Sequence, residues 1–284
     1  MDPVRNLENK KNLNNNLPED SISGRISNGV DTATKEGKYI YCIIDSDQPQ
    51  SFGPLGIGGR GDQLHTICFN GIAALVSDAP LGKYRVSRDN SLAHERAIET
   101  VMTQYTTLPV RFATVAEDEM KVTRILEKEH DRFKDLLGSI AGKTEISLKA
   151  IFKEGIIYKD ILEKYEDIRV LKGKITTLAP EKSHSQRREI GRMVEEALQR
   201  EKEIVRDDII NILSPQAAEV KTNDTYGELM IINAAFFVEK GKEADFDQQV
   251  QQLGGKYSQK VTLKYVGPLP PFNFVNISIN TEDY

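Results

Sequence analysis

The stretch Leu229-Met230-Ile231-Ile232-Asn233-Ala234-Ala235-Phe236-Phe237-Val238 is the longest apolar run of the sequence, and a single asparagine interrupts it. A strand whose consecutive side chains are apolar is covered on both faces, so this run predicts the central strand of a sheet. It is too short for a membrane-spanning helix, which needs about 20 apolar residues. The run therefore places a buried sheet in the second half of the chain.

The segments on either side of this run predict the rest of one folded unit. In chain order they are an alternating strand at 146–152, a short helix or insertion at 154–165, a long amphipathic helix at 183–213, a strand at 217–221, the central strand, a helix at 244–253 that ends at Gly254-Gly255, and a strand at 261–265. The order strand, helix, strand, strand, helix, strand is that of a ferredoxin-like (βαββαβ) domain, an antiparallel sheet with two helices on one face. We expect this C-terminal domain to span residues 143–267.

An N-terminal unit with a different order of elements is expected at residues 37–142. Its strands are predicted at 39–44, 64–69, 72–77 and 108–112, and its helices at 91–105 and 117–137. Asn70-Gly71 between two apolar runs is the strongest short-range signal for a β-hairpin. The chain is therefore predicted to be an α+β protein of two domains, the first being a mixed layer of sheet and helices.

The two ends of the sequence are predicted to behave differently. Residues 1–36 are rich in polar side chains and poor in large apolar ones, so we expect a disordered tail. Near the other end, the stiff run Pro268-Leu269-Pro270-Pro271 is expected to lead the chain out of the second sheet, because proline lacks an amide donor. We expect the segment 268–284 to pack back on the N-terminal domain.

The residues Phe272-Asn273-Phe274 follow that proline run, and they admit two interpretations. In the first, the segment packs back as a strand and clamps the two domains together. This interpretation is favoured because large exposed apolar patches are uncommon. In the second, Phe272, Asn273 and Phe274 form an exposed strip that binds a partner protein. These three residues are the candidate partner-binding site.

Composition and spacing argue against several function classes. The net charge of −5, from 38 basic and 43 acidic residues, argues against a dedicated nucleic-acid-binding protein. Two cysteines and the lack of an apolar N-terminal run favour a soluble cytoplasmic protein that does not bind membranes. The four histidines lack the spacing of metal ligands. Gly56-Ile57-Gly58-Gly59-Arg60-Gly61 is followed by a predicted strand, whereas a dinucleotide site requires a helix there.

His94 is the histidine of most chemical interest, because it lies on the apolar face of its predicted helix. As a general base it would be partnered by Arg111 or Glu95. As a core residue it would bond a backbone carbonyl. The second interpretation is favoured, since no nucleophile with a supporting residue can be named. We therefore expect no catalytic residue, no metal, no cofactor and no small-molecule substrate.

Two longer blocks of the sequence resemble a known family. Leu108-Pro109-Val110-Arg111-Phe112-Ala113-Thr114-Val115 is similar to the L-P-[LV]-R-F-G-T-[VI] block of the gas vesicle protein F/L (GvpF/GvpL) family, with Ala113 where glycine is usual. Leu263-Lys264-Tyr265-Val266-Gly267-Pro268-Leu269-Pro270-Pro271-Phe272-Asn273-Phe274-Val275 is similar to the family's ending. Tyr39-Ile40-Tyr41, residues 71–77 and the His94-Glu95 pair also resemble family positions. The resemblance spans residues 38–278.

The resemblance implies an accessory or minor structural protein required for the assembly of gas vesicles, the gas-filled protein shells of buoyant microbes. It implies two α+β domains, no established catalytic residue, and contacts with the hydrophobic shell protein GvpA and with other accessory proteins. A soluble protein with an open sheet edge would cap such a shell subunit by strand addition. The alternative is a small-ligand-binding protein or an enzyme, because ferredoxin-like sheets host many functions.

Overall fold

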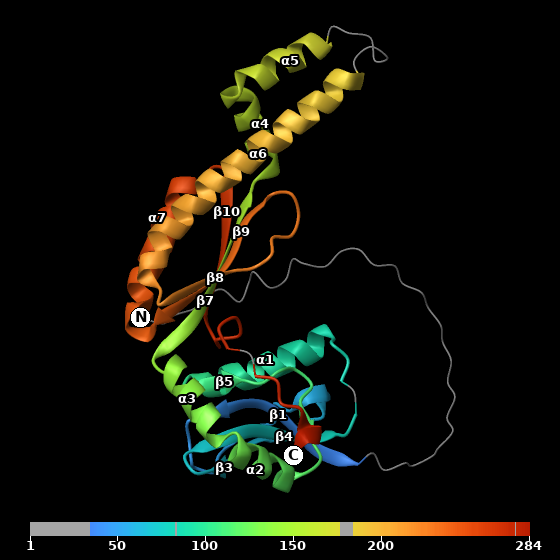
Figure 1. Ribbon diagram of the computed structural model, residues 1–284, viewed down its shortest axis with the longest axis vertical. Helices are drawn as coiled ribbons and strands as arrows, with labels where there is room; N and C mark the ends of the chain where they lie inside the picture. The colour runs from blue at the N-terminus through green and yellow to red at the C-terminus, as the bar shows by residue number, and fades with distance from the viewer. Residues whose placement is uncertain (1–34, 83, 177–183, 276) are drawn as a thin grey trace, which may run out of the picture. The chain divides into compact units, whose positions relative to one another are not determined.

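The structure, a computed structural model, describes residues 35–82, 84–176, 184–275 and 277–284 (Figure 1). The residues from Lys35 to Tyr284 form one contiguous unit that contains two sheets. The predicted disordered tail at 1–36 lies outside the described residues except for Lys35 and Glu36, and the first strand begins at Glu36. Ser183, the expected start of the long helix, also lies outside them.

The first sheet has the strand order β2-β3-β4-β1-β5, and the short strand β6 also pairs with β1. Its pairs are antiparallel. The predicted hairpin is confirmed, because Asn70 and Gly71 have positive φ angles between β3 and β4. In chain order the elements are β1 (Glu36–Ile44), β2 (Ser51–Gly53), the 3-10 turn η2 (Ile57–Gly59), β3 (Leu64–Phe69), β4 (Ile72–Pro80), α1 (Arg88–Met102), β5 (Thr107–Pro109), β6 (Val115–Ala116), α2 (Glu119–Lys128) and α3 (His130–Ile140).

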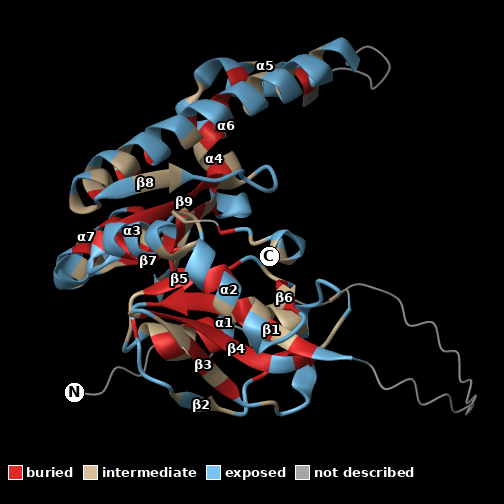
Figure 2. Cartoon of the chain, turned by 60° about the horizontal axis from the view of Figure 1, so that its bottom comes forward, coloured by how far each residue is buried: buried red, intermediate tan, exposed pale blue. Residues whose placement is uncertain are grey.

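β1 lies inside this sheet, and most of its residues are buried (Figure 2). Its apolar side chains divide between two clusters, one on each face. Tyr39 and Tyr41 join a cluster that includes buried residues of α1. Ile40 and Ile43 join a second cluster, which includes buried residues of α2 and α3. Helices therefore cover both faces of the sheet, as the apolar run of β1 predicts.

The second sheet has the strand order β10-β7-β9-β8, and its pairs are antiparallel. β9 pairs on both sides and buries every residue from Ile231 to Val238, which confirms the predicted central strand. The α+β class is confirmed too. In chain order the elements are β7 (Lys143–Phe152), α4 (Glu154–Lys164), α5 (Glu166–Thr176), α6 (His184–Leu213), η4 (Ser214–Gln216), β8 (Glu219–Thr222), β9 (Met230–Glu239), η5 (Lys240–Lys242), α7 (Glu243–Tyr257), β10 (Val261–Leu269) and η6 (Thr281–Asp283).

The long helix α6 and the helix α7 pack on one face of the second sheet (Figure 1). Leu148 of β7 and Phe236 of β9 join Phe246 of α7 in one apolar cluster. Successive side chains of a strand point to opposite faces, so Glu145 and Lys149 of β7 lie on the other side. We call that side, which α6 and α7 do not cover, the helix-free face of the second sheet.

Several helix boundaries differ from the sequence-based expectation. Residues 117–137 form parts of two helices rather than one, because the backbone of Glu129 (φ −97°, ψ 7°) ends α2. α1 begins at Arg88, three residues before the expected start, because the Ser87 hydroxyl accepts a hydrogen bond from the Asn90 amide and caps the helix. The helix α5 was not predicted at all.

α7 continues through Gly254-Gly255 to Tyr257, so the expected end at these glycines was wrong. Neither glycine has a positive φ angle. Leu253 and Tyr257 are buried in the apolar cluster of the second sheet. Burial of this helix face outweighs the cost of about 1 kcal/mol that each glycine adds inside a helix.

β10 continues through Pro268 to Leu269, so the expected exit at Pro268 was wrong. Among the described residues β10 pairs only with β7, and a proline is tolerated on such an edge strand. The pairing has a register shift near its end, where Leu269 lies opposite Glu145. After β10 the described residues form no further strand, and a single parallel bridge joins Val110 to Ile277.

Candidate functional site

The residues that follow β10 contact the second sheet through Asn273. Its backbone amide donates to Oε2 of Glu145 at 2.7 Å, and its Nδ2 donates to Oε1 at 2.5 Å. Nζ of Lys221 donates to the Asn273 carbonyl at 3.1 Å, and Nδ2 of Asn223 donates to Oδ1 of Asn273 at 3.0 Å. Glu145 is 1% exposed. Burial raises the pKa of its carboxyl, and the hydrogen bonds from Asn273 act in the opposite direction.

The same segment makes a further contact with the second sheet and then reaches the first sheet. Phe274 stacks on Phe237 of β9, with ring centroids 4.7 Å apart and planes 16° from parallel. Ile277 is buried in the apolar cluster beneath α2 and α3, and its carbonyl accepts a hydrogen bond from the Arg111 amide at 2.9 Å. A stretch of five residues thus bonds to both sheets.

The three candidate partner-binding residues therefore differ in their surroundings. Asn273 and Phe274 are partly buried and engaged with the second sheet. Phe272 is 37% exposed and lines a cleft. The clamp interpretation accounts for the contacts of Asn273 and Phe274, whereas Phe272 alone presents an exposed ring.

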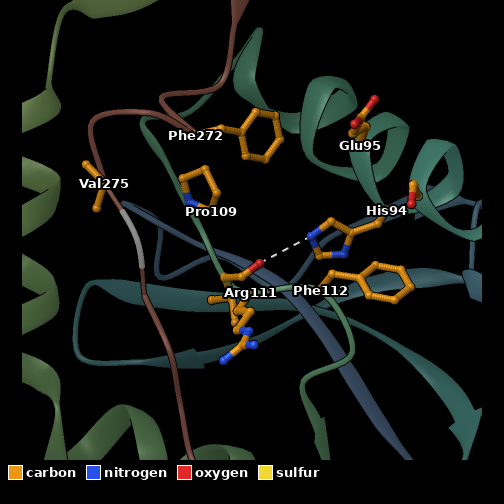
Figure 3. Close-up of a pocket in the computed structure, with 9 residues that line it drawn as sticks. His94, Glu95, Pro109, Arg111, Phe112, Phe272 and Val275 are labelled. Atoms are coloured by element: carbon orange, nitrogen blue, oxygen red, sulfur yellow. Dashed lines mark hydrogen bonds between the residues drawn. The ribbon is translucent and has the colours of Figure 1, made fainter. Parts of the chain in front are cut away.

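The cleft beside Phe272 has a volume of about 270 Å³ (Figure 3). Its walls come from three stretches that are distant in the sequence, namely α1, the residues around the end of β5, and the segment after β10. Phe272 and Pro109 lie on the same side of the cleft, and the Arg111 side chain points away from Phe272. The lining therefore mixes aromatic and proline rings with charged groups at the margin.

His94 lies at the base of this cleft and is 5% exposed. Its Nε2 lies 3.2 Å from the Val110 carbonyl oxygen, which can only accept, so Nε2 carries the proton. Nδ1 therefore accepts from the Tyr39 hydroxyl at 3.1 Å, and that hydroxyl accepts from the Ala113 amide at 2.8 Å. Burial lowers the pKa of His94 to about 4, although the bond to the Val110 carbonyl acts in the opposite direction. The predicted bond to a backbone carbonyl is confirmed.

Ala113 occupies a turn in the left-handed region, with φ at +68°. Glycine is usual at this position of the family block, and it adopts such angles without the steric cost that a Cβ adds. The turn directs the Ala113 amide at Tyr39 and so holds the ring that orients His94. The departure from glycine therefore preserves the turn at some cost in backbone strain.

The cleft is better suited to binding than to proton transfer. Both ring nitrogens of His94 are engaged within the protein, so neither is directed at a ligand.

Across residues 35–284, apart from the undescribed positions, no group of three or more His, Cys, Asp or Glu side chains could hold a metal ion. None of the described helices is long and apolar enough to cross a membrane.

Sequence reasoning missed Glu145 as part of this arrangement. Glu145 stands just before the strand predicted at 146–152, and it lies within β7, where a charged side chain on the polar face is normally solvated. Its partner Asn273 lies 128 positions away. No local pattern connects the two residues, so only the folded chain brings them together.

A family model described as gas vesicle synthesis protein GvpL/GvpF matches residues 37–276. The chain belongs to this family. Gas vesicle protein F of Nostoc sp. (strain PCC 7120) is 29% identical over 250 residues, which cover 85% of this chain and 99% of that protein. The crystal structure of GvpF from Anabaena sp. PCC7120 has a TM-score of 0.74 at 27% identity, and covers 86% of this chain and 100% of its own. GvpF from Microcystis aeruginosa has a TM-score of 0.67 at 26% identity, over 84% of this chain and 98% of its own.

Membership of the GvpL/GvpF family confirms the resemblance seen in the sequence. Three of the stretches that resemble the family meet at the cleft. They are the block that begins at Leu108, the His94-Glu95 pair and the closing block that contains Phe272. The sequence identified these blocks separately, and the fold places them side by side (Figure 3).

Proposed function

We propose that this protein is an accessory factor required for the assembly of gas vesicles in the cytoplasm. The observation that carries the proposal is the match of the GvpL/GvpF family model over residues 37–276. The relative from Nostoc and the solved structure from Anabaena are both gas vesicle protein F, and each aligns with this chain over nearly the whole of its own length. The role therefore rests on the complete fold rather than on one shared segment.

The partners in this proposal are the shell protein GvpA and other accessory proteins of the gas vesicle. A hydrophobic shell subunit with exposed β edges would aggregate before it is assembled. Strand addition to an open edge is a general way to occupy such edges. Among the described residues, β8 and β10 each pair on one side only, so both offer an edge for that purpose.

The proposed organisation has two domains. Residues 37–142 would form the first, and residues 143–267 a ferredoxin-like second, with 268–284 packed back on the first. The strand order β10-β7-β9-β8 and the two helices on one face support the ferredoxin-like assignment. The burial of Ile277 in the apolar cluster of the first sheet, and the hydrogen bond from the Arg111 amide to the Ile277 carbonyl, support the packing of the last segment on the first domain.

Binding rather than catalysis is the proposed mode of action. The engaged nitrogens of His94 support it, because a general base needs a free lone pair aimed at its substrate. The cleft leaves a ligand-binding alternative, which the partly buried Ser91 and the exposed Arg111 would serve. A folded Ser91→Ala/Arg111→Ala variant should support normal vesicle formation. Its failure to do so, with an unchanged melting temperature, would favour the alternative.

The decisive experiment is deletion of the gene in its native host, with complementation by the intact gene. We expect the deletion strain to lack gas vesicles under the light microscope and the complemented strain to regain them. Normal vesicles in the deletion strain would show that this protein is not required for gas vesicle assembly.

Binding to the shell protein is a separate step and has a separate test. The purified full-length chain is immobilised and presented with GvpA, with an unrelated hydrophobic protein as the control. Retention of GvpA alone is the expected result. If GvpA is not retained, direct capping of the shell protein is wrong, whatever the deletion shows.

A further inference from the structure

Two lysines lie directly opposite each other on the helix-free face of the second sheet. Lys149 of β7 pairs in register with Lys264 of β10. Leu148 precedes Lys149, and Tyr265 follows Lys264. Both Leu148 and Tyr265 point to the helix-covered face and pack in its apolar cluster, so the two lysines lie on the other side of the sheet. Like charges at directly opposed positions of an antiparallel pair are destabilising.

The strand positions next to the two lysines on this face carry no acidic side chain. The adjacent same-face positions carry Ser147, Ile151, Asn233, Thr262 and Val266, none of which is acidic. Among the described residues, neither Lys149 nor Lys264 forms an ion pair or a side-chain hydrogen bond. The other half of the face differs, because there Glu145 and Phe237 are engaged by Asn273 and Phe274.

Protection of the sheet edge accounts for only one of these lysines. A lysine on an edge strand discourages edge-to-edge association, and Lys264 lies on the edge strand β10. Lys149 lies on β7, which has a partner on each side, so it protects no edge. A destabilising pair that edge protection does not explain is expected at a functional site.

We infer that Lys149 and Lys264 form a docking site for an acidic, extended segment of a partner protein. This inference rests on the proposed function, since it names the surface through which the assembly factor acts. A segment added to the open edge of β10 would place alternate side chains over this face. One would lie beside Lys264, and the next beside Val266, which is 53% exposed. The segment is thus expected to carry an acidic and an apolar residue two positions apart.

Charge and composition favour a protein over a nucleic acid. The complement to two unpaired ammonium groups is a carboxylate or a phosphate. Sheet platforms that bind single-stranded nucleic acids stack bases on aromatic rings, and the positions around the two lysines carry none. The net charge of −5 also opposes association with a polyanion.

The test compares the full-length chain with its Lys149→Gln/Lys264→Gln variant. Each is titrated with GvpA, with each accessory protein of the same gas vesicle gene cluster, and with a single-stranded oligonucleotide of about 20 nucleotides. We expect the variant to bind at least one of these proteins about tenfold more weakly or worse. Its melting temperature should be unchanged or higher by up to about 2 °C, since the like-charge pair is removed.

Two control variants separate the site from total charge. Lys172→Gln removes the same charge from an exposed position of α5 and should bind as the wild type does. Lys149→Arg/Lys264→Arg keeps both charges and should retain most of the affinity.

Several results would overturn the docking site. The first is equal binding of the proteins by the wild type and the Lys149→Gln/Lys264→Gln variant. The second is that the wild type binds none of these proteins. The third is that the wild type binds the oligonucleotide and that, of the variants, only Lys149→Gln/Lys264→Gln loses this binding. The deletion strain distinguishes this failure from failure of the proposed function. If that strain lacks vesicles but the Gln variant restores them, the docking site is wrong and the assembly role stands.

Discussion

At the residue scale, Ala113 shows how one side chain departs from a family pattern without changing the turn. Its φ of +68° is costly for any residue with a Cβ, whereas glycine adopts it freely. Ala113→Gly should therefore raise the free energy of unfolding by about 1 kcal/mol, measured by urea denaturation. Ala113→Val is the control in the opposite direction and should lower the free energy of unfolding. A glycine variant no more stable than the wild type would contradict the strain at this turn.

His94 predicts how stability depends on pH. The pKa of His94 is about 4 in the folded chain, against an ordinary value of 6.5, so the unfolded chain binds the extra proton between these pH values. Its contribution is therefore complete above pH 6.5 and is lost as the pH falls towards 4, by on the order of 3 kcal/mol in total.

His94→Gln should remove that contribution to the pH dependence. The measurement is urea unfolding of both chains from pH 7 to 4.5. Subtracting the two curves cancels the other titrating groups, Glu145 among them, and leaves the His94 term. Parallel curves for the two chains would show that His94 titrates normally in the folded state.

At the scale of elements, α7 shows that packing can override a helix-stop signal. Gly255 lies inside α7 without a positive φ, and a Cβ added there meets no atom within 4 Å. Gly255→Ala should therefore stabilise the chain by about 0.5–1 kcal/mol, measured by thermal or urea unfolding.

Gly142 provides the control for this substitution. A Cβ added there also meets no atom within 4 Å, but its φ is +70°. Gly142→Ala should therefore destabilise the chain. Two alanine variants that shift stability in the same direction would show that backbone angle does not decide the outcome.

The elements also differ in how well the sequence predicts them. The apolar run of β9 and the Asn70-Gly71 hairpin are local signals, and both predictions were confirmed. The end of α7 was misjudged because its continuation depends on burial of Leu253 and Tyr257 against a sheet. The path of β10 through Pro268 was misjudged because only the sheet order reveals a strand that is open on one side.

The candidate site was less predictable than the fold. The sequence singled out His94 and the Phe272-Asn273-Phe274 stretch from local patterns. It could not pair Asn273 with Glu145, because that contact depends on how distant segments meet. The same limit applies to Lys149 and Lys264, whose opposition appears only once the strand register is known.

At the scale of the whole molecule, the segment after β10 should couple the two sheets. Phe274 stacks on Phe237 of the second sheet, and Ile277 is buried in the core of the first. A chain cut after Leu269 loses both contacts. We expect two separated unfolding transitions in calorimetry, where the intact chain shows one cooperative transition.

Phe272→Ala is the matched control on the same segment, because it removes an exposed ring and leaves the contacts to both sheets intact. It should unfold in a single transition like the wild type. A shortened chain that also unfolds in one transition would mean that other contacts between the sheets suffice.

The distance along the chain between Glu145 and Asn273 has a consequence for synthesis. The two residues are 128 positions apart, so at about 5–20 residues per second roughly 6–26 s pass between their additions to the nascent chain. Throughout that interval the Glu145 carboxylate has no amide donors from Asn273 and must stay hydrated. The end of the second sheet around Glu145 therefore stays wet as the chain emerges from the ribosome, and it loses its water only after Asn273 has been made.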